Sequence, residues 1–458
     1  MAGTTARLYR LAWPVLVAQL ATISMMAIDT IVVGHAGTDN LAALAVGASI
    51  YVSLALALSG VVQAILPGMA HRLGKNDPAG AAHIIRQAFW LVLLLACIGD
   101  LLLLFPGWMI AFAELPPPVA ALTVDYLHVL AFSLPASLGY RAFHAIAGGV
   151  GRTRPLMWLS LSQTSGHALL APLLADTVTL GGVTLGLGLG AVGAAGSQAV
   201  LAWLICLVGV GVLWRSPYYR QLLGKSGLWP GRPDWAQQRY LLRLGVPMGM
   251  SYFVEISAFT LMAIFIARLG PEVLSGHRIV ANISAMLYMF PLAMGTATAA
   301  LVGQADGAQD WRETVRVVQR GFAMAAAGSV LLAGLLWVFR VPLAALGSPD
   351  PEVIRVAVGL IAYVAGYQLF DALQTIAGFA LRGYHVTFVP LGVHLASFWL
   401  FGLGGGYWLA FEGLEILGVA PMGAAGFWCA ALIATLVAAI GLVSLLLWVQ
   451  RARRQNSL

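Results

Sequence analysis

The sequence predicts an all-α integral membrane protein with twelve transmembrane helices in two pseudo-symmetric six-helix lobes. Three observations lead to this prediction: the composition, a series of apolar runs, and one long polar segment in the middle of the chain. Hydrophobic residues make up 60% of the 458 positions and charged residues only 9%. A soluble globular protein carries roughly a quarter charged residues. We therefore expect lipid to be the solvent of this chain.

Each apolar run is bounded by glycine, proline or charged residues and is long enough to cross a bilayer as a helix. The first run, Leu11 to Gly34, is too long for the hydrophobic core of a signal peptide, so we interpret it as the first span. The predicted spans lie near residues 8–34, 41–70, 82–112, 118–147, 155–178, 186–214, 240–268, 273–303, 313–339, 351–382, 386–411 and 422–449.

The long polar connection, residues 215–240, divides the chain into two sets of six spans. We expect an N-lobe at 1–214 with transmembrane helices 1–6. We expect a C-lobe at 240–450 with transmembrane helices 7–12. A cytoplasmic linker at 215–239 joins the lobes, and a cytoplasmic tail at 451–458 follows the last span.

The basic residues predict the orientation in the membrane. An even number of spans places both termini on one side, and that side carries 20 of the 25 Lys and Arg residues. Because Lys and Arg accumulate on the cytoplasmic side, both termini are predicted to be cytoplasmic. The net charge of +7 is then a topology signal, and no nucleic-acid partner is expected. The basic side holds Arg7, Arg10, Arg72, Lys75, Arg86, Arg152, Arg154, six residues around the linker, Arg312, Arg316, Arg320, Arg382, Arg451, Arg453 and Arg454, and the opposite side holds Asp39, Glu114, Asp125, Asp176, Glu272, Asp350, Glu352, Glu412 and Glu415.

The two halves are internal repeats. Six spans per half is an even number, so both halves begin on the same side and are expected to be parallel repeats. Such repeats suit alternating access, in which two bundles rock around a shared cleft. A shift of 233 residues pairs Arg10-Leu11-x-x-Pro14 with Arg243-Leu244-x-x-Pro247, Gly37 with Gly270, Asp39 with Glu272 and Gly74 with Gly307, and a later shift of 235 pairs Gly148 with Gly383 and Pro155 with Pro390.

Four acidic residues, Asp29, Asp100, Glu255 and Asp371, lie inside predicted spans. A carboxylate within a span costs roughly 2.5–3.5 kcal/mol on insertion scales, so each one needs a structural or functional reason. Asp100 lies late in its span, where a structural role or snorkelling to the interface is expected. The other three are candidates for function, and the alternative is a structural hydrogen-bond network.

The three candidate acids have polar neighbours. Glu255 is followed by Ser257, and Asp29 has Thr30 beside it and Ser24 about one and a half turns earlier. Asp371 shares a helix face with Tyr367 and Gln374, four residues before it and three after it. A site of carboxylates and hydroxyls binds H⁺, a hard ion such as Na⁺, or a cationic organic molecule. Since one negative charge can serve these ligands in turn, the set suits an antiporter.

At these residues the sequence resembles the multidrug and toxic compound extrusion (MATE) family, specifically its NorM-type branch. The matching stretches are PVLVAQLATISMMAIDTIVVG, GVPMGMSYFVEISAF, LYMFPLAMG and QLFDALQTIAGFALRGYHVTFVP, and the resemblance covers essentially the whole chain. The resemblance implies a V-shaped pair of six-helix lobes and efflux driven by Na⁺ or H⁺.

The resemblance also implies site residues. Glu255 and Asp371 match the family's C-lobe cation site and would hold Na⁺ in a sodium-coupled protein, while Asp29 matches its N-lobe acid, which is linked to protonation or drug binding. Tyr288, Asn282 and Tyr367 lie where the family places further cation-site or cleft residues; Gln374 is added from its place beside Asp371. Many relatives read HQ in the eighth span, whereas this chain has Gly276-His277-Arg278. His277 is therefore open to packing or to gating.

We therefore expect a multidrug efflux antiporter in a bacterial cytoplasmic membrane. It would export lipophilic cationic dyes and fluoroquinolone-like drugs in exchange for Na⁺ or H⁺, as a monomer with no cofactor besides the coupling ion. The alternative is an exporter or flippase of lipid-linked or amphipathic metabolites on the same fold. A membrane enzyme is not expected, because the sequence has no DDxxD, P-loop or HExxH motif.

Overall fold

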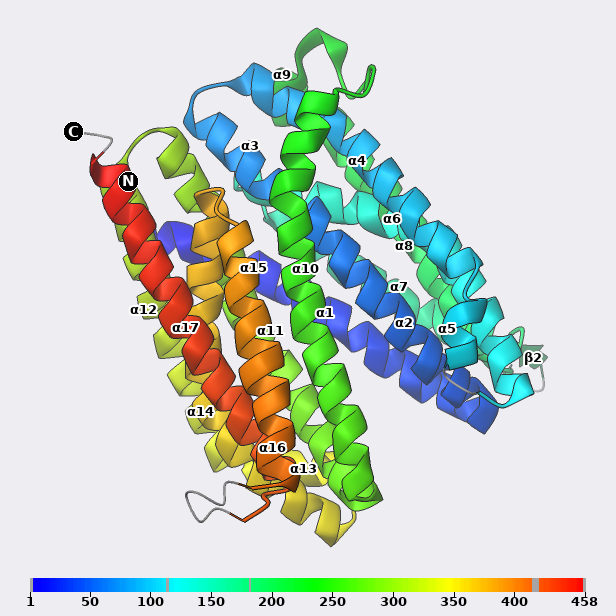
Figure 1. Ribbon diagram of the computed structural model, residues 1–458. Coiled ribbons are helices and arrows are strands. Elements are labelled where there is room, and N and C mark those ends of the chain that lie inside the picture. Colours follow the sequence, from blue (N-terminus) through cyan, green and yellow to red (C-terminus); the bar gives the residue numbers. More distant parts are fainter. Residues whose placement is uncertain (1–2, 113–114, 181–182, 414–419, 456–458) are drawn as a thin grey trace. The chain divides into compact units, whose positions relative to one another are not determined.

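The computed structural model describes residues 3–112, 115–180, 183–413 and 420–455 (Figure 1). The described chain is almost entirely helical, with one short antiparallel hairpin in which Val178 lies opposite Leu185. The elements are α1 (Thr4–His35), α2 (Thr38–Val62), α3 (Ile65–Gly74), α4 (Pro78–Leu104), α5 (Gly107–Phe112), α6 (Pro117–Val150), α7 (Arg154–Ala175), β1 (Val178–Leu180), β2 (Val183–Leu185), α8 (Gly190–Arg215), α9 (Pro217–Leu223), η1 (Gly224–Ser226), α10 (Trp235–Ile266), η2 (Ala267–Leu269), α11 (Pro271–Gly307), α12 (Trp311–Val338), α13 (Arg340–Gly347), α14 (Pro351–Gly383), α15 (Phe388–His394), the π-helix η3 (Leu395–Gly404), α16 (Gly405–Phe411) and α17 (Ala424–Gln455).

The predicted all-α membrane fold is confirmed. Among the described residues, eleven helical segments are long and apolar enough to cross a membrane, with α2–α3 and α15–α16 each counted as one. The remaining predicted span, the fifth in order at 155–178, corresponds to α7, a helix of 22 residues. A helix of that length extends about 33 Å, which is enough to cross the hydrocarbon core. α7 is not among the eleven because His167, Gln163 and four hydroxyl side chains make its central part less apolar.

The backbone follows the internal repeat. Under the shift of 233 residues, Gly37 and Gly270 share a φ of 108° where the second helix of each half begins. Asn76 and Gln309, also equivalent, are left-handed at φ 56° and 58°. Each is followed by an aspartate whose carboxylate caps the next helix: Asp77 accepts from the Gly80 amide, and Asp310 accepts from the Glu313 amide. Equivalent residues therefore make equivalent turns in the two halves.

The described chain divides into two compact units. The N-half unit comprises Val17–Gly249, and the C-half unit comprises Met1–Leu16 together with Met250–Leu458. These divisions fall inside α1 and α10, whereas the sequence prediction placed the boundary in the linker. The first turns of α1 belong with the C-half unit because Leu8 and Leu11 pack into a buried cluster with residues of α11, α12, α14 and α17.

Within the N-half unit, α6 packs against α2, α3, α4 and α8, and α7 packs against α8. The α7–α8 contact requires a glycine, because a Cβ on Gly193 would lie 2.4 Å from the carbonyl oxygen of Leu174. Within the C-half unit, α11, α12 and α17 all pack against α14. Each unit therefore buries one helix among the others, α6 in the N-half unit and α14 in the C-half unit. These two helices are equivalent in the repeat.

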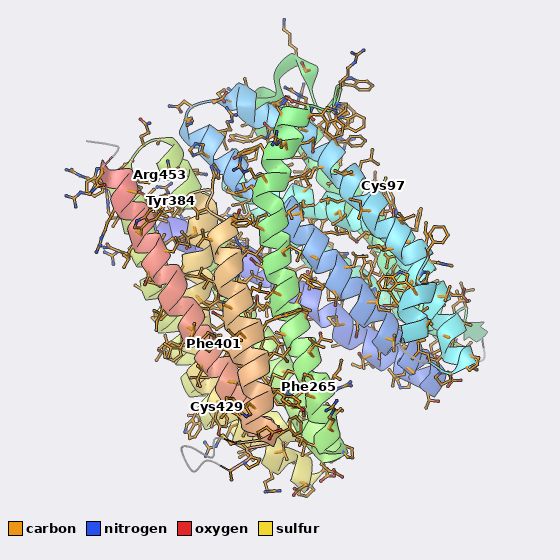
Figure 2. All side chains as sticks on the ribbon, viewed as in Figure 1. Cys97, Phe265, Tyr384, Phe401, Cys429 and Arg453 are labelled. Carbon is orange, nitrogen blue, oxygen red and sulfur yellow. The ribbon has the colours of Figure 1, made fainter. Side chains whose placement is uncertain are left out.

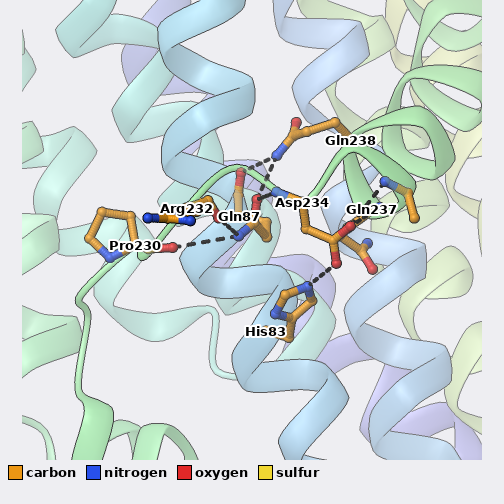
Figure 3. Close-up of polar contacts among 8 residues, drawn as sticks. His83, Gln87, Pro230, Arg232, Asp234, Gln237 and Gln238 are labelled. Carbon is orange, nitrogen blue, oxygen red and sulfur yellow. Dashed lines mark hydrogen bonds and ion pairs between the residues drawn. The ribbon is translucent and has the colours of Figure 1, made fainter.

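In the N-half unit the segment before α10 is fastened to α4 (Figure 3). His83 Nε2 and Asp234 Oδ2 lie 2.9 Å apart, and the Gln87 amide donates to the Arg232 carbonyl oxygen at 3.0 Å. Asp234 also accepts hydrogen bonds from the backbone amides of Ala236 and Gln237. These contacts attach the polar linker to one end of α4.

The described chain ends lie at the same end of the C-half unit (Figure 1). Arg7 pairs with Glu313 at 3.2 Å, which joins the start of α1 to the start of α12. Arg453 near the end of α17 lies 3.7 Å from Asp306, and Figure 2 shows it beside Tyr384, just after α14. Two residues that the sequence assigned to the opposite face, Glu114 and Glu415, lie outside the described residues.

Candidate functional site

The C-half unit holds two of the predicted acids, Asp371 on α14 and Glu255 on α10. Asp371 is fully buried. Its Oδ1 accepts a hydrogen bond from Gln374 Nε2 at 3.0 Å, and the Tyr367 hydroxyl also interacts with this carboxyl, whereas its Oδ2 makes no hydrogen bond of ordinary geometry among the described residues. A buried carboxyl oxygen without a partner is rare in a native protein and calls for a water molecule or an ion.

Glu255 is partly buried and makes no hydrogen bond or ion pair within the described part of the chain. Its charge interacts with those of Asp371 and Arg382. Two carboxyl groups thus share one polar site, although they come from helices more than a hundred residues apart. Like charges in such a site repel each other unless a proton or another cation is present.

Gln374 links Asp371 to a residue that the sequence analysis did not single out, His394. The Gln374 amide nitrogen points to Asp371, so its Oε1 must accept from His394 Nε2, 3.2 Å away. His394 ends α15, where the π-helix η3 begins, and its Nδ1 has no hydrogen-bond partner among the described residues. A histidine inside the apolar segment LGVHLASFWLF was a signal that could have identified it, because ionisable residues are rare in spans.

The predicted aromatic residues differ in their environments. Tyr367 is 3% exposed, and its ring makes edge contacts with Phe259 and Trp428 at centroid distances of 6.4 Å. Tyr288 is partly buried, and electrostatic interactions link it to Glu255 and Asp371. The structure therefore brings Glu255, Asp371, Gln374, Tyr367 and Tyr288 together in the C-half unit.

Asn282 is not part of this group. It is exposed and has no described hydrogen bond to any of these residues. His277, which the sequence left open between packing and gating, is 2% exposed and accepts a hydrogen bond from Trp428 Nε1 at 3.2 Å. That environment favours a packing role for His277.

A buried arginine lies close to the acids. The sequence analysis assigned Arg382 to the basic membrane face, but Arg382 is only 8% exposed. Its guanidinium donates to the Tyr252 hydroxyl at 2.9 Å and stacks over the rings of Tyr252 and Phe379 at 4.9 and 4.1 Å. Since its charge also interacts with Glu255, Arg382 reduces the repulsion between the two carboxylates.

The third predicted acid, Asp29, has a different environment in the N-half unit. Asp29 Oδ1 lies 2.7 Å from His167 Nε2, and His167 Nδ1 lies 2.9 Å from Ser197 Oγ. His167 on α7 is fully buried and was not singled out from the sequence, although it lies in the apolar segment GHALLAP. The hydroxyls of Ser24 and Thr30, noted as polar neighbours of Asp29, instead bond to carbonyl oxygens of their own helix.

Asp100 belongs to neither group. It is partly buried, its Oδ1 has no described hydrogen-bond partner, and its charge interacts with Tyr51. The Tyr51 hydroxyl itself donates to Ser137 at 3.3 Å. Among the described residues no group of three or more His, Cys, Asp or Glu side chains is arranged to hold a metal ion.

Comparison with known proteins decides the family. The MatE family model matches residues 14–173 and 247–408, one segment in each half of the chain. The chain belongs to the MatE family. The predicted resemblance to the multidrug and toxic compound extrusion transporters is thereby confirmed, and the chain is a member of a transporter family.

Several curated relatives cover nearly the whole chain. A probable multidrug resistance protein NorM from Aromatoleum aromaticum is 44% identical over 98% of this chain and 95% of its own length. The corresponding protein from Chromobacterium violaceum is 35% identical over 97% and 93%. The multidrug resistance protein PmpM from Pseudomonas aeruginosa is 32% identical over 92% and 86%.

Solved structures of MATE transporters share the fold. The eukaryotic MATE transporter AtDTX14 matches with a TM-score of 0.86 at 18% identity, covering 99% of both chains. A multidrug resistance MATE family transporter described as outward-facing matches with a TM-score of 0.88 at 16% identity, covering 99% of this chain and 97% of its own. At these identities the likeness concerns the fold alone.

Proposed function

We propose that the chain is a multidrug efflux antiporter that exports organic cations in exchange for Na⁺ or H⁺ by alternating access. The observation that carries the proposal is the buried Asp371 carboxyl, which has one oxygen without a described partner and a second carboxyl, Glu255, interacting with its charge. The printed names of the relatives, which are multidrug resistance proteins, support export of drugs.

The chemistry of the C-half site supports exchange between two kinds of cation. When both carboxyls are ionised, the site carries excess negative charge in a poorly solvated place and attracts any cation that fits. Binding of H⁺ or Na⁺ neutralises the site and weakens its attraction for an organic cation. Occupancy by one cation therefore lowers the affinity for the other, which is the thermodynamic requirement for antiport.

The site also suggests which residues would hold the coupling ion. Glu255 and Asp371 would supply carboxylate oxygens to Na⁺, and the free Oδ2 of Asp371 is the atom best suited to receive either Na⁺ or H⁺. Tyr367 and Tyr288 are the nearest additional oxygen donors predicted from the sequence. Asp29 would bind a proton or a cationic drug in the N-half unit.

The same proposal covers location and assembly. The bacterial relatives and the positive-inside pattern support a bacterial cytoplasmic membrane with both termini in the cytoplasm. We expect a monomer that works without a cofactor besides the coupling ion. A reporter fused within the 215–240 segment should be cytoplasmic, and a reporter found outside would contradict this orientation.

The test is export from proteoliposomes under separately imposed Na⁺ and pH gradients. A lipophilic cationic dye should be exported against its gradient when one of the two ion gradients is present, and the effective gradient identifies the coupling ion. A carboxylate dye of similar size should not be exported. Equal export of both dyes, or export that needs neither gradient, would contradict the proposal.

One observation favours a second candidate. The buried guanidinium of Arg382 could bind an anionic headgroup, as an exporter or flippase of lipid-linked or amphipathic metabolites would require. The neighbouring carboxylates oppose this, because they repel the same anion. Export of a labelled anionic amphiphile that Arg382→Gln abolishes would favour this candidate over the cation antiporter.

A further inference from the structure

The segment between α8 and α10 carries a group of basic residues that the proposed transport does not use. We infer that the end of α8, α9 and η1 form a binding site for the headgroup of an anionic phospholipid, with Arg220 and Lys225 holding its phosphate. The site lies wholly within the N-half unit. It concerns the membrane around the chain and does not depend on which ion or drug the protein transports.

A cavity of about 540 Å³ lies between the end of α8 and the turn that follows α9. Arg220 on α9 and Lys225 in η1 supply two cations to its wall, Trp214 supplies an indole ring, and Gln221 supplies an amide. Small-molecule sites span roughly 300–1,000 Å³, so the cavity has room for a phosphodiester group. The guanidinium can bind two phosphate oxygens at once, and the ammonium adds a second positive charge.

The charge of this segment is positive throughout. The sequence has no Asp or Glu from residue 177 to residue 233. The same interval contains four basic residues, Arg215, Arg220, Lys225 and Arg232. Within the described part of the chain, their side chains form no ion pair, hydrogen bond or ring contact. The segment therefore keeps its positive charge for an anion that is not part of the chain.

Other basic residues at this end of the unit have partners in the fold. Arg72 pairs with Asp77 at 2.8 Å, and the Arg152 guanidinium stacks over the Tyr218 ring at 4.1 Å. Asp234, the next acid along the chain, is engaged in the linker contacts described above. The orientation of a membrane protein requires only that basic residues lie on one side. It does not explain why two unpaired cations line one cavity.

Tryptophans mark the depth of this cavity in the membrane. Trp214, Trp229 and Trp235 are exposed, and Trp90 on α4 donates to the Gly231 carbonyl oxygen at 3.2 Å. Tryptophan accumulates at the membrane–water interface. Because Trp214 forms part of the wall, the cavity lies at the level of the lipid headgroups. Anionic headgroups on the cytoplasmic side attract Lys and Arg at this level.

An apolar helix face leads from the cavity into the membrane. Trp214, Val210 and Leu207 on α8 are spaced by four and three residues, so they share one face of the helix. All three side chains are exposed. A phospholipid whose phosphate lies between Arg220 and Lys225 can place an acyl chain along this face.

These observations favour a lipid over a soluble anion. A soluble phosphate would use only the two cations, whereas a phospholipid uses the cations, the indole ring and the apolar face together. They also favour an anionic lipid, because the choline cation of phosphatidylcholine would be repelled by Arg220 and Lys225. The site should therefore prefer phosphatidylglycerol to phosphatidylcholine with the same acyl chains.

The test counts the lipids that the purified, delipidated full-length protein retains in a neutral detergent, by native mass spectrometry during titration with phosphatidylglycerol. The wild type should bind phosphatidylglycerol more tightly than phosphatidylcholine. The double variant Arg220→Gln/Lys225→Gln should weaken the tightest phosphatidylglycerol binding about thirtyfold, because each basic residue near an anionic headgroup contributes about fivefold.

Matched variants make the test specific to the cavity. Arg232→Gln/Arg239→Gln removes the same charge from the same end of the unit, but these residues lie outside the cavity wall. Its affinity should fall less than about threefold, since solvent and salt screen charges that do not touch the lipid. Gln221→Glu keeps both cations and adds a negative charge to the wall, so it should weaken binding, whereas Gln221→Ala should not. The four positions are exposed, so thermal unfolding should stay close to that of the wild type.

The measurement can contradict the inference in two ways. Wild-type affinity in Arg220→Gln/Lys225→Gln, or an equal loss in the two double variants, would show that the cavity does not hold the headgroup. Displacement of the lipid by an equal concentration of inorganic phosphate would show that the ligand is a soluble anion. Binding is measured without a drug or an ion gradient, so failure of the proposed antiport would leave this inference standing.

Discussion

The acids of the two units differ in how well they are paired. Asp29 in the N-half unit bonds to a buried histidine, which bonds in turn to a serine, and all three belong to one unit. In the C-half unit Asp371 has one bonded and one unbonded oxygen, and Glu255 has no hydrogen bond among the described residues. Asp29 and His167 are thus already hydrogen-bonded to each other within their own unit. The Asp371–Glu255 pair of the C-half unit, in contrast, keeps a carboxyl oxygen without a described hydrogen bond, and that oxygen can bind a ligand.

The comparison teaches that the internal repeat supplies the scaffold but not the chemistry. Equivalent glycines and helix caps recur in both halves. Under the same alignment, Asp29 is paired with Met262 and Glu255 with Thr22. The acids of the two halves therefore lie at positions that are not equivalent in the repeat, even though α1 and α10 are equivalent helices, and the two units can bind different ligands on related backbones.

We expect the largest effect on export from substitution of Asp371 or Glu255. Asp371→Asn and Glu255→Gln keep size and hydrogen-bonding capacity but remove the charge that attracts the coupling ion. Each should reduce gradient-driven export of a cationic dye by roughly a hundredfold or more, while the protein still inserts and folds. The control is Glu352→Gln, an exposed acid at the start of α14 that pairs with Arg355. Wild-type export by both acid variants would contradict the role of the C-half site.

Replacement of Arg382 by Gln should have the next largest effect. Arg382→Gln removes a positive charge that interacts with Glu255, which makes the C-half site more negative. The affinity of the site for the coupling ion should therefore rise about tenfold. The midpoint of ion-dependent export should move to lower ion concentration, and Arg355→Gln on the surface should not move it. A midpoint shifted in the opposite direction would show that Arg382 does not oppose cation binding.

A smaller effect is expected from His394. His394→Leu removes the donor to Gln374 Oε1, so the amide is no longer held with its nitrogen toward Asp371. Loss of one hydrogen bond of about 1 kcal/mol predicts a roughly fivefold weaker response to the coupling ion. His394→Gln keeps a donor at the same place and should stay close to the wild type. Equal losses in the two variants would indicate that packing, and not the hydrogen bond, is the role of His394.

The linker provides a pH prediction outside the spans. The backbone amide of Gln237, and then the His83 side chain, lower the pKa of Asp234 below its ordinary value of 3.8. A lowered carboxyl pKa contributes stability that is present above the ordinary value and is lost as the pH falls through the folded value. Cleavage of the linker by pepsin should therefore accelerate below about pH 4 in the wild type.

Asp234→Ala supplies the reference for that measurement. This variant lacks the hydrogen bonds to Gln237 and His83, so its linker should be cleaved at the faster rate at every pH. The wild-type cleavage rate divided by the rate of the variant is then independent of the pH dependence of pepsin itself. A ratio that stays constant across pH 4 would show that Asp234 does not fasten the linker.

The smallest effect is expected at Asp100. Its carboxyl has an oxygen without a described partner and no ion pair within the described residues, so removing the charge breaks no ion pair that the structure shows. Asp100→Asn should export at close to the wild-type rate and melt within a few degrees of it, by a thermal-shift measurement. A loss of export comparable with that of Asp371→Asn would place Asp100 among the coupling residues.

Much of the fold could be predicted because lipid imposes simple rules on sequence. The apolar runs, the polar linker and the repeat all follow from the need to satisfy the backbone within hydrocarbon. The hairpin at β1 and β2 was not predicted, because it lies between two apolar runs without a polar signal. The π-helix η3 was not predicted either, since its residues are as apolar as those of an ordinary span.

The site could be predicted only in part, for a related reason. Acids in apolar runs are conspicuous, so Asp29, Glu255 and Asp371 were found from the sequence alone. Their partners His167 and His394 come from other helices, and a histidine in a span has no fixed spacing from the acid it contacts. The burial of Arg382 could not be predicted, because a basic residue near a helix end is usually exposed, and here its guanidinium stacks over two aromatic rings instead.

The central claim is that the coupling ion and the organic cation exclude each other at the C-half acids. The most direct measurement is the affinity of the purified protein for a lipophilic cation, titrated against Na⁺ at fixed pH and against pH without Na⁺. We expect the wild-type affinity to fall as either Na⁺ or H⁺ rises, and we expect Asp371→Asn to lose the greater part of that dependence. A wild-type affinity that changes with neither ion would contradict the account.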